Sequence, residues 1–357
     1  MSYNILIINP GSTSTKVGVY IDETPYCVTT IRHSVEELEQ YDDITEQHTF
    51  RRQVVLDWLK SNNIPLRFDA IIGRGGLIKP ISGGVYEVNE QMCKEAFHAF
   101  RKHACNLGCI IAYELTKMQE NAHCTAYIAD PVVVDELLPE ARISGSPLMP
   151  RRAIWHALNQ RAIAHRYAKE IGRKYEDLNL IVCHLGGGIS IAAHEKGRAI
   201  DANNGLDGEG PFSPERAGSL PASDLIHLCY SGKYTEEQLK KRIAGQAGLM
   251  AHLGTTDMVE ILNRIKQGDE KARLLIDAMI FHTAKSIAAE GAVLMGRVDA
   301  ILITGGMAHS DYITNGITQR INYLAPVHIF PGEDEIEALA MNALSVLRGE
   351  RKAKKYL

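Results

Sequence analysis

The chain has 357 residues, 45% of them hydrophobic and 23% charged, and its formal net charge is −4 at pH 7. This length exceeds what one hydrophobic core usually reaches, so it predicts about two domains, and the composition excludes a disordered chain. The small negative charge provides no basic field, which argues against a nucleic-acid partner.

The first predicted element is a β-hairpin at the N-terminus. An apolar strand that begins at Asn4 leads into Asn9-Pro10-Gly11-Ser12-Thr13-Ser14, and a second strand runs from Lys16 to Tyr20. Glycine leaves backbone N–H groups accessible and the hydroxyls add donors, so this turn is suited to phosphate oxygens. The alternative is a hairpin that needs glycine only for its backbone conformation.

A second segment repeats this plan. A strand from Leu180 to Cys183 precedes His184-Leu185-Gly186-Gly187-Gly188, and another strand runs from Ile189 to His194. A third buried strand, Asp299 to Thr304, ends in Gly305-Gly306, where a ligand can approach the backbone closely. Two glycine-rich turns that open two halves of one chain indicate a nucleotide site built from hairpin turns.

The remaining features predict a cytoplasmic protein without a membrane contact. The apolar run Ile5 to Ile8 is too short for a signal peptide, and Ala278 to Gly296 is interrupted by charged residues, which indicates a buried helix. Seven cysteines without a Cys-x-x-Cys pair fit reduced thiols. The basic run Arg348 to Lys355 is interpreted as a solvated tail.

Short motifs occur in order along nearly the whole chain: Asn9-Pro10-Gly11-Ser12-Thr13-Ser14-Thr15-Lys16, Gly73-Arg74-Gly75-Gly76, His103-Ala104-Cys105-Asn106-Leu107-Gly108, Ala129-Asp130-Pro131, His184 to Ser190, Pro214-Glu215-Arg216-Ala217-Gly218-Ser219, Thr304-Gly305-Gly306 and Pro331-Gly332-Glu333-Asp334-Glu335. Together these motifs resemble the acetate and butyrate kinase family of the actin-like ATPase superfamily. The segments Arg74 to Pro80 and Gly208 to Arg216 are similar to the butyrate-kinase branch.

The resemblance implies Mg²⁺-dependent transfer of the γ-phosphoryl group of ATP to the carboxylate of butyrate, a small-molecule partner. A carboxylate is already ionised at neutral pH, so no general base is required. Arginines must offset the repulsion between carboxylate and phosphate, and Arg74 and Arg216 are the candidates because small residues flank each. A surface ion pair is the alternative for each arginine.

Further catalytic residues follow from the resemblance alone. His184 is similar to the family histidine that donates to the phosphoryl group in flight, and His103 is a second candidate; each could instead be a packing residue. Asp130 is expected to orient Arg216 or the phosphoryl group, with a turn or helix cap as its alternative.

The resemblance also implies a nucleotide site and a metal site. Mg²⁺ takes hard oxygen ligands, and Asn9 with Glu333 or Glu335 meets that need; acetate kinases differ from this chain in the corresponding run, so the choice between the two glutamates stays open. Asp257 could contact the nucleoside or cap a helix. The expected contacts with ATP or ADP are Ser12, Thr13, Ser14, Lys16, Gly186, Gly187, Gly188, Asp257, Gly305 and Gly306.

By resemblance the fold is α/β, with two actin-like (ribonuclease H-like) domains whose mixed sheets flank a nucleotide cleft. Residues 1–148 are expected to form the N-terminal domain on the carboxylate side, and residues 149–357 the C-terminal domain on the nucleotide side, with the last helix packing back on the first. The small residues at 144–147 suggest a hinge. Family resemblance implies a homodimer or a higher homo-oligomer.

Other functions remain compatible with these patterns. A branched-chain fatty-acid, propionate or acetate kinase would differ only in pocket volume, and Gly75-Gly76 followed by Leu77 and Ile78 is expected to line a pocket for about four carbons. A chaperone-like or nucleotide-gated binding ATPase is the alternative of another class, but it would not need two arginines on the acceptor side.

Overall fold

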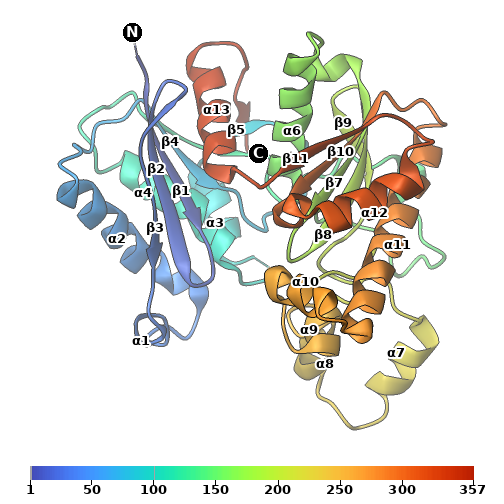
Figure 1. Ribbon diagram of the computed structural model, residues 1–357. Coiled ribbons are helices and arrows are strands. Elements are labelled where there is room, and N and C mark those ends of the chain that lie inside the picture. Colours follow the sequence, from blue (N-terminus) through green and yellow to red (C-terminus); the bar gives the residue numbers. More distant parts are fainter. Residues whose placement is uncertain (1, 100) are drawn as a thin grey trace. The chain divides into compact units, whose positions relative to one another are not determined.

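The computed structural model describes residues 2–99 and 101–357, which form two compact units (Figure 1). Unit 1 contains the residues up to Val134 together with Ala157–Asn159 and Asp334–Leu357, and unit 2 contains Asp135–His156 and Gln160–Glu333. The boundary expected between residues 148 and 149 therefore falls inside unit 2, as does the segment 144–147 that we expected to be a hinge. One reason is that the Leu138 N–H donates to the carbonyl of Ile200, which lies in the sheet of unit 2.

Unit 1 is built on a seven-stranded mixed sheet with the order β12-β5-β6-β4-β1-β2-β3. Strand β1 pairs antiparallel with β2 and parallel with β4, which in turn runs parallel to β6. The strands are β1 (Asn4–Pro10), β2 (Ser14–Ile21), β3 (Thr24–Arg32), β4 (Ala70–Arg74), β5 (Val85–Glu87), β6 (Thr125–Ala129) and β12 (Lys354–Lys355).

Helices cover both faces of the sheet in unit 1. Val17 and Val19 belong to the same apolar cluster as α2 and α4, whereas a side chain added at Gly18 would meet Ile336 of α13. Alternate residues of a strand point to opposite faces, so α13 lies on the face opposite α2 and α4. The helices of unit 1 are α1 (Val35–Leu38), α2 (His48–Ser61), α3 (Glu90–Phe97), α4 (Leu107–Thr116) and α13 (Glu335–Leu347).

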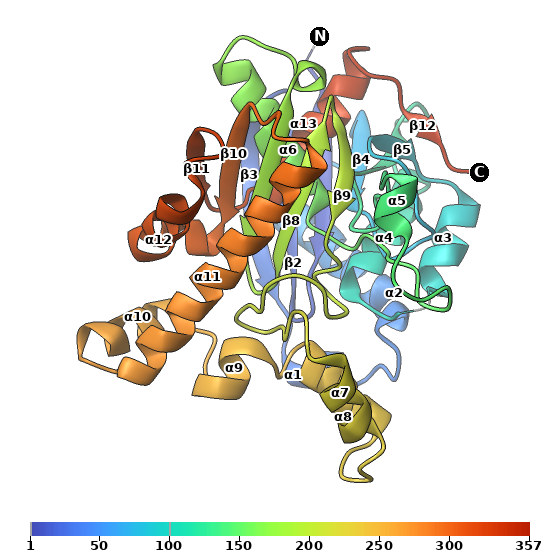
Figure 2. The ribbon, with the colours of Figure 1, turned by 90° about the vertical axis from the view of Figure 1, so that its right-hand side faces the viewer.

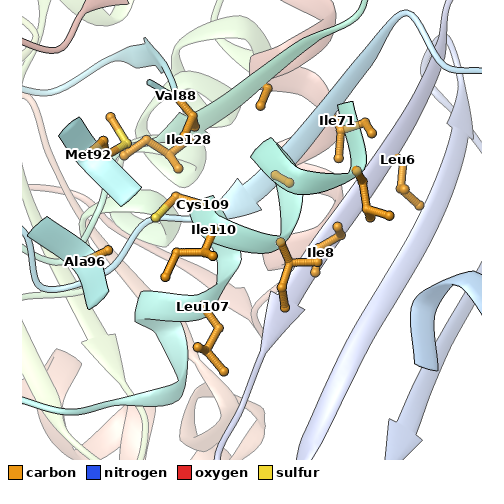
Figure 3. Packing of buried hydrophobic residues seen from close by; sticks show 14 of the residues in the cluster. Leu6, Ile8, Ile71, Val88, Met92, Ala96, Leu107, Cys109, Ile110 and Ile128 are labelled. Carbon is orange, nitrogen blue, oxygen red and sulfur yellow. The ribbon is translucent and has the colours of Figure 1, made fainter. Parts of the chain in front are cut away.

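The core of unit 1 is continuous on the α4 face. Helix α4 is almost entirely buried because it packs against the sheet on one side and against α3 on the other. Figure 3 shows its side chains Leu107 and Ile110 among those of Leu6, Ile8, Met92 and Ala96.

Unit 2 has a five-stranded mixed sheet with the order β11-β10-β7-β8-β9. Ile181 and Cys183 pack in one cluster with residues of α11 and α12, and Leu180 and Val182 pack in another with residues of α6. Figure 2 shows the long helix α11 crossing in front of this sheet. The strands are β7 (Asn179–Leu185), β8 (Ile189–Glu195), β9 (Arg198–Ala202), β10 (Ala300–Gly305) and β11 (Val327–Pro331). The helices are α5 (Pro139–Arg142), α6 (Ala157–Glu170), α7 (Ala222–Cys229), α8 (Glu236–Ile243), α9 (Gly248–Leu253), α10 (Met258–Lys266), α11 (Glu270–Val293) and α12 (Asp311–Ile321).

The two units repeat one topology. Strands β3-β2-β1-β4-β6 of unit 1 and β9-β8-β7-β10-β11 of unit 2 have the same order, with an antiparallel hairpin followed by parallel strands in each. This arrangement confirms the predicted α/β fold with two mixed sheets. It also confirms both predicted hairpins, and it places their turns at equivalent positions.

The expectations for the apolar segment 278–296 and for the basic C-terminal run had different outcomes. The interrupted apolar segment 278–296 lies mostly in α11, as expected, and no helix in the described part of the chain is long and apolar enough to cross a membrane. The basic C-terminal run is not a purely solvated tail, because Lys354 and Lys355 form β12 and Tyr356 is only 2% exposed.

Candidate functional site

Three predicted site residues of unit 1 lie at the carboxyl ends of adjacent parallel strands. Asn9 is the second-to-last residue of β1, Arg74 is the last residue of β4, and Asp130 directly follows β6. The pairings Ile8 with Gly73 and Arg74 with Ala129 bring these ends to one edge of the sheet. Ligands of α/β sheets bind at such an edge, so the topology supports the choice of these residues.

Glu335, the first residue of α13, joins this edge. The Asn9 Nδ2 donates to Glu335 Oε2 at 2.7 Å, and the Arg74 guanidinium forms an ion pair with Glu335 Oε1. The side chains of Arg74 and Glu335 are 14% and 17% exposed, so the pair is only partly screened by water. The sequence did not show that the proposed metal glutamate and the proposed substrate arginine are partners.

The first turn, residues 11–14, has an exposed outer side. Ser12 and Thr13 are exposed, and the Gly11 N–H donates to the Ser14 carbonyl at 2.8 Å, which closes the turn. Lys16 is exposed and lies directly opposite Asn9 in the hairpin, so both side chains are on the same face. The predicted phosphate-binding residues of this hairpin are therefore accessible together.

Asp130 and His103 have structural contacts within unit 1. Asp130 is 3% exposed, has a φ of +38°, and accepts the Gly84 N–H at 2.7 Å through Oδ1. His103 is exposed and accepts the Cys105 N–H at 3.2 Å, which caps the short helix at residues 104–106. Asp130 thus adopts the turn role that was its alternative, whereas His103 is an exposed helix cap and not the packing residue that was its alternative. The catalytic roles of both residues stay predictions.

The glycines after Arg74 do not line an alkyl pocket. A Cβ on Gly76 would lie 2.5 Å from the Asn106 Cα, and a Cβ on Gly75 would lie 2.6 Å from the Pro131 Cβ. Leu77 and Ile78 are each 3% exposed and belong to the hydrophobic core. The expected pocket wall is wrong, because neighbouring chain fills the space that the glycines leave.

In unit 2, His184 ends β7 among close polar neighbours. Its ring stacks on His156 with centroids 3.8 Å apart, and its Nε2 lies 3.3 Å from Glu333 Oε2. His156 Nδ1 and the Ser190 hydroxyl are 2.8 Å apart, which holds the stacked ring. A Cβ on Gly186 would lie 2.8 Å from His184 Nε2, so a side chain at this position would crowd the ring nitrogen. His156 was not singled out from the sequence, because a lone histidine before a helix carries no distinctive signal.

The second turn, residues 186–188, packs against the predicted arginine motif. The Ser213 hydroxyl donates to the Gly187 carbonyl at 2.6 Å, and a Cβ on Gly188 would lie 3.6 Å from the Arg216 Cζ. Arg216 Nη1 donates to the Gly205 carbonyl at 3.0 Å. The structure therefore brings Arg216 to the same turn as His184, although 32 positions separate them (216 − 184).

The other predicted nucleotide residues lie near strand ends of unit 2 or on its helices. Gly305 has a φ of +97° and approaches the Leu185 carbonyl too closely for a side chain, whereas Gly306 faces open space. The Thr304 hydroxyl donates to the Gly332 carbonyl at 3.0 Å. Glu333, the residue after Gly332, therefore lies near the end of the strand that contains Thr304. Asp257 caps α10 by accepting the N–H groups of Val259 and Glu260. A nucleoside contact of Asp257 stays a prediction.

The proposed metal ligands divide between the units. Asn9 and Glu335 lie together in unit 1, while Glu333 lies beside His184 in unit 2. Among residues 2–99 and 101–357 no group of three or more His, Cys, Asp or Glu side chains could hold a metal. Mg²⁺ retains several waters and needs few protein oxygens, so the amide and carboxylate oxygens of Asn9 and Glu335 fit it.

Comparisons with known proteins agree with this geometry. The model of the acetokinase family matches residues 147–336, and a probable butyrate kinase of Bacteroides thetaiotaomicron is 62% identical over 346 residues, covering 97% of this chain and 98% of the relative. The chain belongs to the acetokinase family. A second relative, butyrate kinase 1 of Clostridium acetobutylicum, is 51% identical over 356 residues and covers 99% of each chain.

The fold of this acetokinase-family chain matches solved structures of kinases. The acetate kinase of Porphyromonas gingivalis aligns with a TM-score of 0.77 at 18% identity, covering 97% of this chain and all of that one. At such identity the likeness shows the fold alone. Family membership shows that the chain is a carboxylate kinase that uses ATP or ADP.

Proposed function

We propose that this acetokinase-family chain is a butyrate kinase, which reversibly converts ATP and butyrate to ADP and butanoyl phosphate. The observation that carries the proposal is the identity of 50–62% over nearly the whole chain with relatives named butyrate kinase or probable butyrate kinase. The Arg74, His184 and Arg216 motifs supply the groups that this chemistry requires.

The reaction needs charge neutralisation more than acid–base catalysis. A carboxylate oxygen attacks the γ-phosphorus, the bond from that phosphorus to the β–γ bridging oxygen breaks, and ADP leaves with the electron pair. No proton has to move, so positioning and electrostatic stabilisation account for the rate. In our proposal Arg74 binds the substrate carboxylate, while Arg216 and His184 donate to the phosphoryl oxygens. A guanidinium binds carboxylate oxygens through charge-assisted hydrogen bonds, so Arg74 has the chemistry that this role requires.

The remaining predicted site residues are assigned roles from their positions in each unit. Asp130 is assigned to orienting Arg216 or the phosphoryl group, and His103 is a second candidate for donating to that group. Asp257, Gly305 and Gly306 are assigned to the nucleoside. The first turn with Lys16 and the second turn are assigned to the phosphates, because their glycines and hydroxyls place donors at strand ends. A homodimer or higher homo-oligomer is expected from the family, and light scattering would measure it.

Mg²⁺ is proposed to be held by Asn9 and Glu335. When bound, Mg²⁺ would neutralise charge that develops on the phosphate oxygens. A carboxylate offers about four lone-pair sites, so Glu335 can bind both Arg74 and a metal. Glu333 is the alternative ligand, but its carboxylate lies beside His184 and not beside Asn9.

The test is to trap acyl phosphate with hydroxylamine while ATP is supplied with straight-chain C2 to C6 acids and with isobutyrate. Butyrate should give the highest kcat/KM, and omission of Mg²⁺ should abolish the signal. Acetate used at least as well as butyrate would overturn the butyrate assignment but leave a carboxylate kinase. ATP hydrolysis without acyl hydroxamate from any acid would reject the kinase proposal itself.

A further inference from the structure

A fully buried arginine lies beneath the first turn of unit 1. Arg51 of α2 is 0% exposed, and its guanidinium uses Nε, Nη1 and Nη2 as donors. The acceptors are the carbonyls of Gly11 (2.7 Å), Ser12 (3.0 Å) and Ser14 (2.9 Å), the Thr15 hydroxyl (3.2 Å) and Gln47 Oε1 (2.9 and 3.1 Å). One side chain therefore holds three carbonyls of a four-residue turn.

These bonds determine where the amides of the turn point. In a planar trans peptide the carbonyl of one residue and the N–H of the next point in opposite directions. Because the carbonyls of Gly11 and Ser12 point inward to Arg51, the N–H groups of Ser12 and Thr13 point outward. The Thr13 carbonyl is also paired, since it accepts the His33 N–H at 2.9 Å beside the end of β3. The exposed side of the turn is thus a surface of donors.

The charge of Arg51 is surrounded by neutral hydrogen-bond acceptors. All its hydrogen-bond acceptors in the described part of the chain are neutral, and no ion pair to Arg51 occurs there. Burial lowers the pKa of Arg51 to about 10, so the guanidinium stays charged at neutral pH. Burial, and next the Arg51 charge, lower the pKa of the neighbouring His33, which leaves the imidazole neutral. A buried cation without a counter-ion is costly, and an anion on the outer side of the turn would offset that cost.

We propose that Arg51 is a positioning residue for phosphate binding: it holds the turn carbonyls inward so that the Ser12 and Thr13 amides face the phosphates of ATP. This inference rests on the proposed kinase function. Arg51 does not touch the nucleotide; it acts through the backbone and through its charge. The sequence offered no signal for it, because the turn and Arg51 are 40 positions apart.

The experiment compares two neighbouring arginines of α2. Arg51→Gln should raise the KM for ATP and the Kd for ADP by about 10- to 100-fold, as expected for lost anion donors, while the KM for butyrate changes less than about twofold. Arg52→Gln is the matched control, because Arg52 binds Glu114 at 2.7 Å and has no contact with the turn. The control should leave all three constants near those of the parent, even if thermal stability falls equally in both variants.

A second variant covers the case in which Arg51→Gln does not fold. Arg51→Lys retains the charge but cannot serve the separate carbonyls with a planar fork, so it should show the same selective loss of ADP affinity in a smaller degree. A folded Arg51→Gln or Arg51→Lys that binds ADP like the parent, or that loses butyrate and ADP binding equally, would overturn the proposal. ADP binding is measured without turnover, so this outcome is distinct from a failure of the parent to phosphorylate butyrate.

Discussion

Three arginines, Arg74, Arg216 and Arg51, lie in different environments. Arg74 pairs with a carboxylate at a strand end, Arg216 reaches a backbone carbonyl beside a glycine turn, and Arg51 is buried among neutral acceptors. A planar guanidinium can serve each environment, because it offers five donors in fixed directions. Each environment leads to a separate expectation for substitution.

Replacement of Arg74 or Arg216 by alanine should depress kcat by about 10²- to 10³-fold, since each removes a charged donor from the phosphoryl-transfer site. Lysine at either position should restore only part of the rate, because a point charge cannot bind two oxygens in the same geometry. Steady-state kinetics with circular dichroism as the folding control would measure this. Near-parent turnover in a folded alanine variant would exclude that arginine from the site.

A buried carboxyl group makes stability depend on pH. Burial raises the pKa of Glu290 to about 8, with a further contribution from Asp201, and Glu290 Oε2 has no hydrogen-bond partner in the described part of the chain. The folded protein therefore binds a proton that the unfolded chain releases near pH 4.5. Stability from this group is present below pH 4.5 and is lost as the pH rises to about 8, by up to about 1.4 kcal/mol per pH unit.

Glu290→Gln should remove that slope. The amide stays neutral, so the variant should become more stable than the parent at pH 8 and differ little from it at pH 5. Urea unfolding at both values would measure the difference. A parent and a variant with parallel stability curves from pH 5 to 8 would show that Glu290 is ionised in the folded protein.

At the scale of elements, the C-terminal strand β12 ties the end of the chain to unit 1. Asn89 Nδ2 donates to the Tyr356 carbonyl at 2.7 Å, Lys354 Nζ donates to the Gly83 carbonyl at 2.6 Å, and the Tyr356 hydroxyl donates to Glu95. Tyr356 also belongs to the hydrophobic core. The strand thus holds the segment that follows Arg74 and includes Gly84, the partner of Asp130.

Tyr356→Ala should lower the free energy of unfolding by about 3 kcal/mol, because it removes a buried aromatic ring and leaves a cavity. Tyr356→Phe should cost about 1.5–3 kcal/mol, the contribution of a hydrogen bond to a charged group. Lys355→Ala is the control, since Lys355 is exposed. Equal stability of Tyr356→Ala and Lys355→Ala would mean that strand β12 and Tyr356 do not pack against unit 1 as described.

At the scale of the whole molecule, one strand plan occurs twice. Each unit places a glycine-containing turn after its first strand and proposed site residues at the ends of its parallel strands. The chain passes between the units near residues 134, 156–160 and 333, so α13 and the C-terminal strand belong to the unit in which the chain began.

The sequence by itself determined the two hairpins, the helix α11 and the motifs at strand ends. These depend on neighbouring residues: apolar runs favour strands, and glycine and hydroxyl residues favour the turns. The tertiary structure alone decided that Glu335 joins Asn9, 326 positions away, that Arg51 lies under the first turn, and that Asn106 fills the space beside Gly76. Such contacts arise when distant segments pack, and no local pattern encodes the partner that a buried side chain meets.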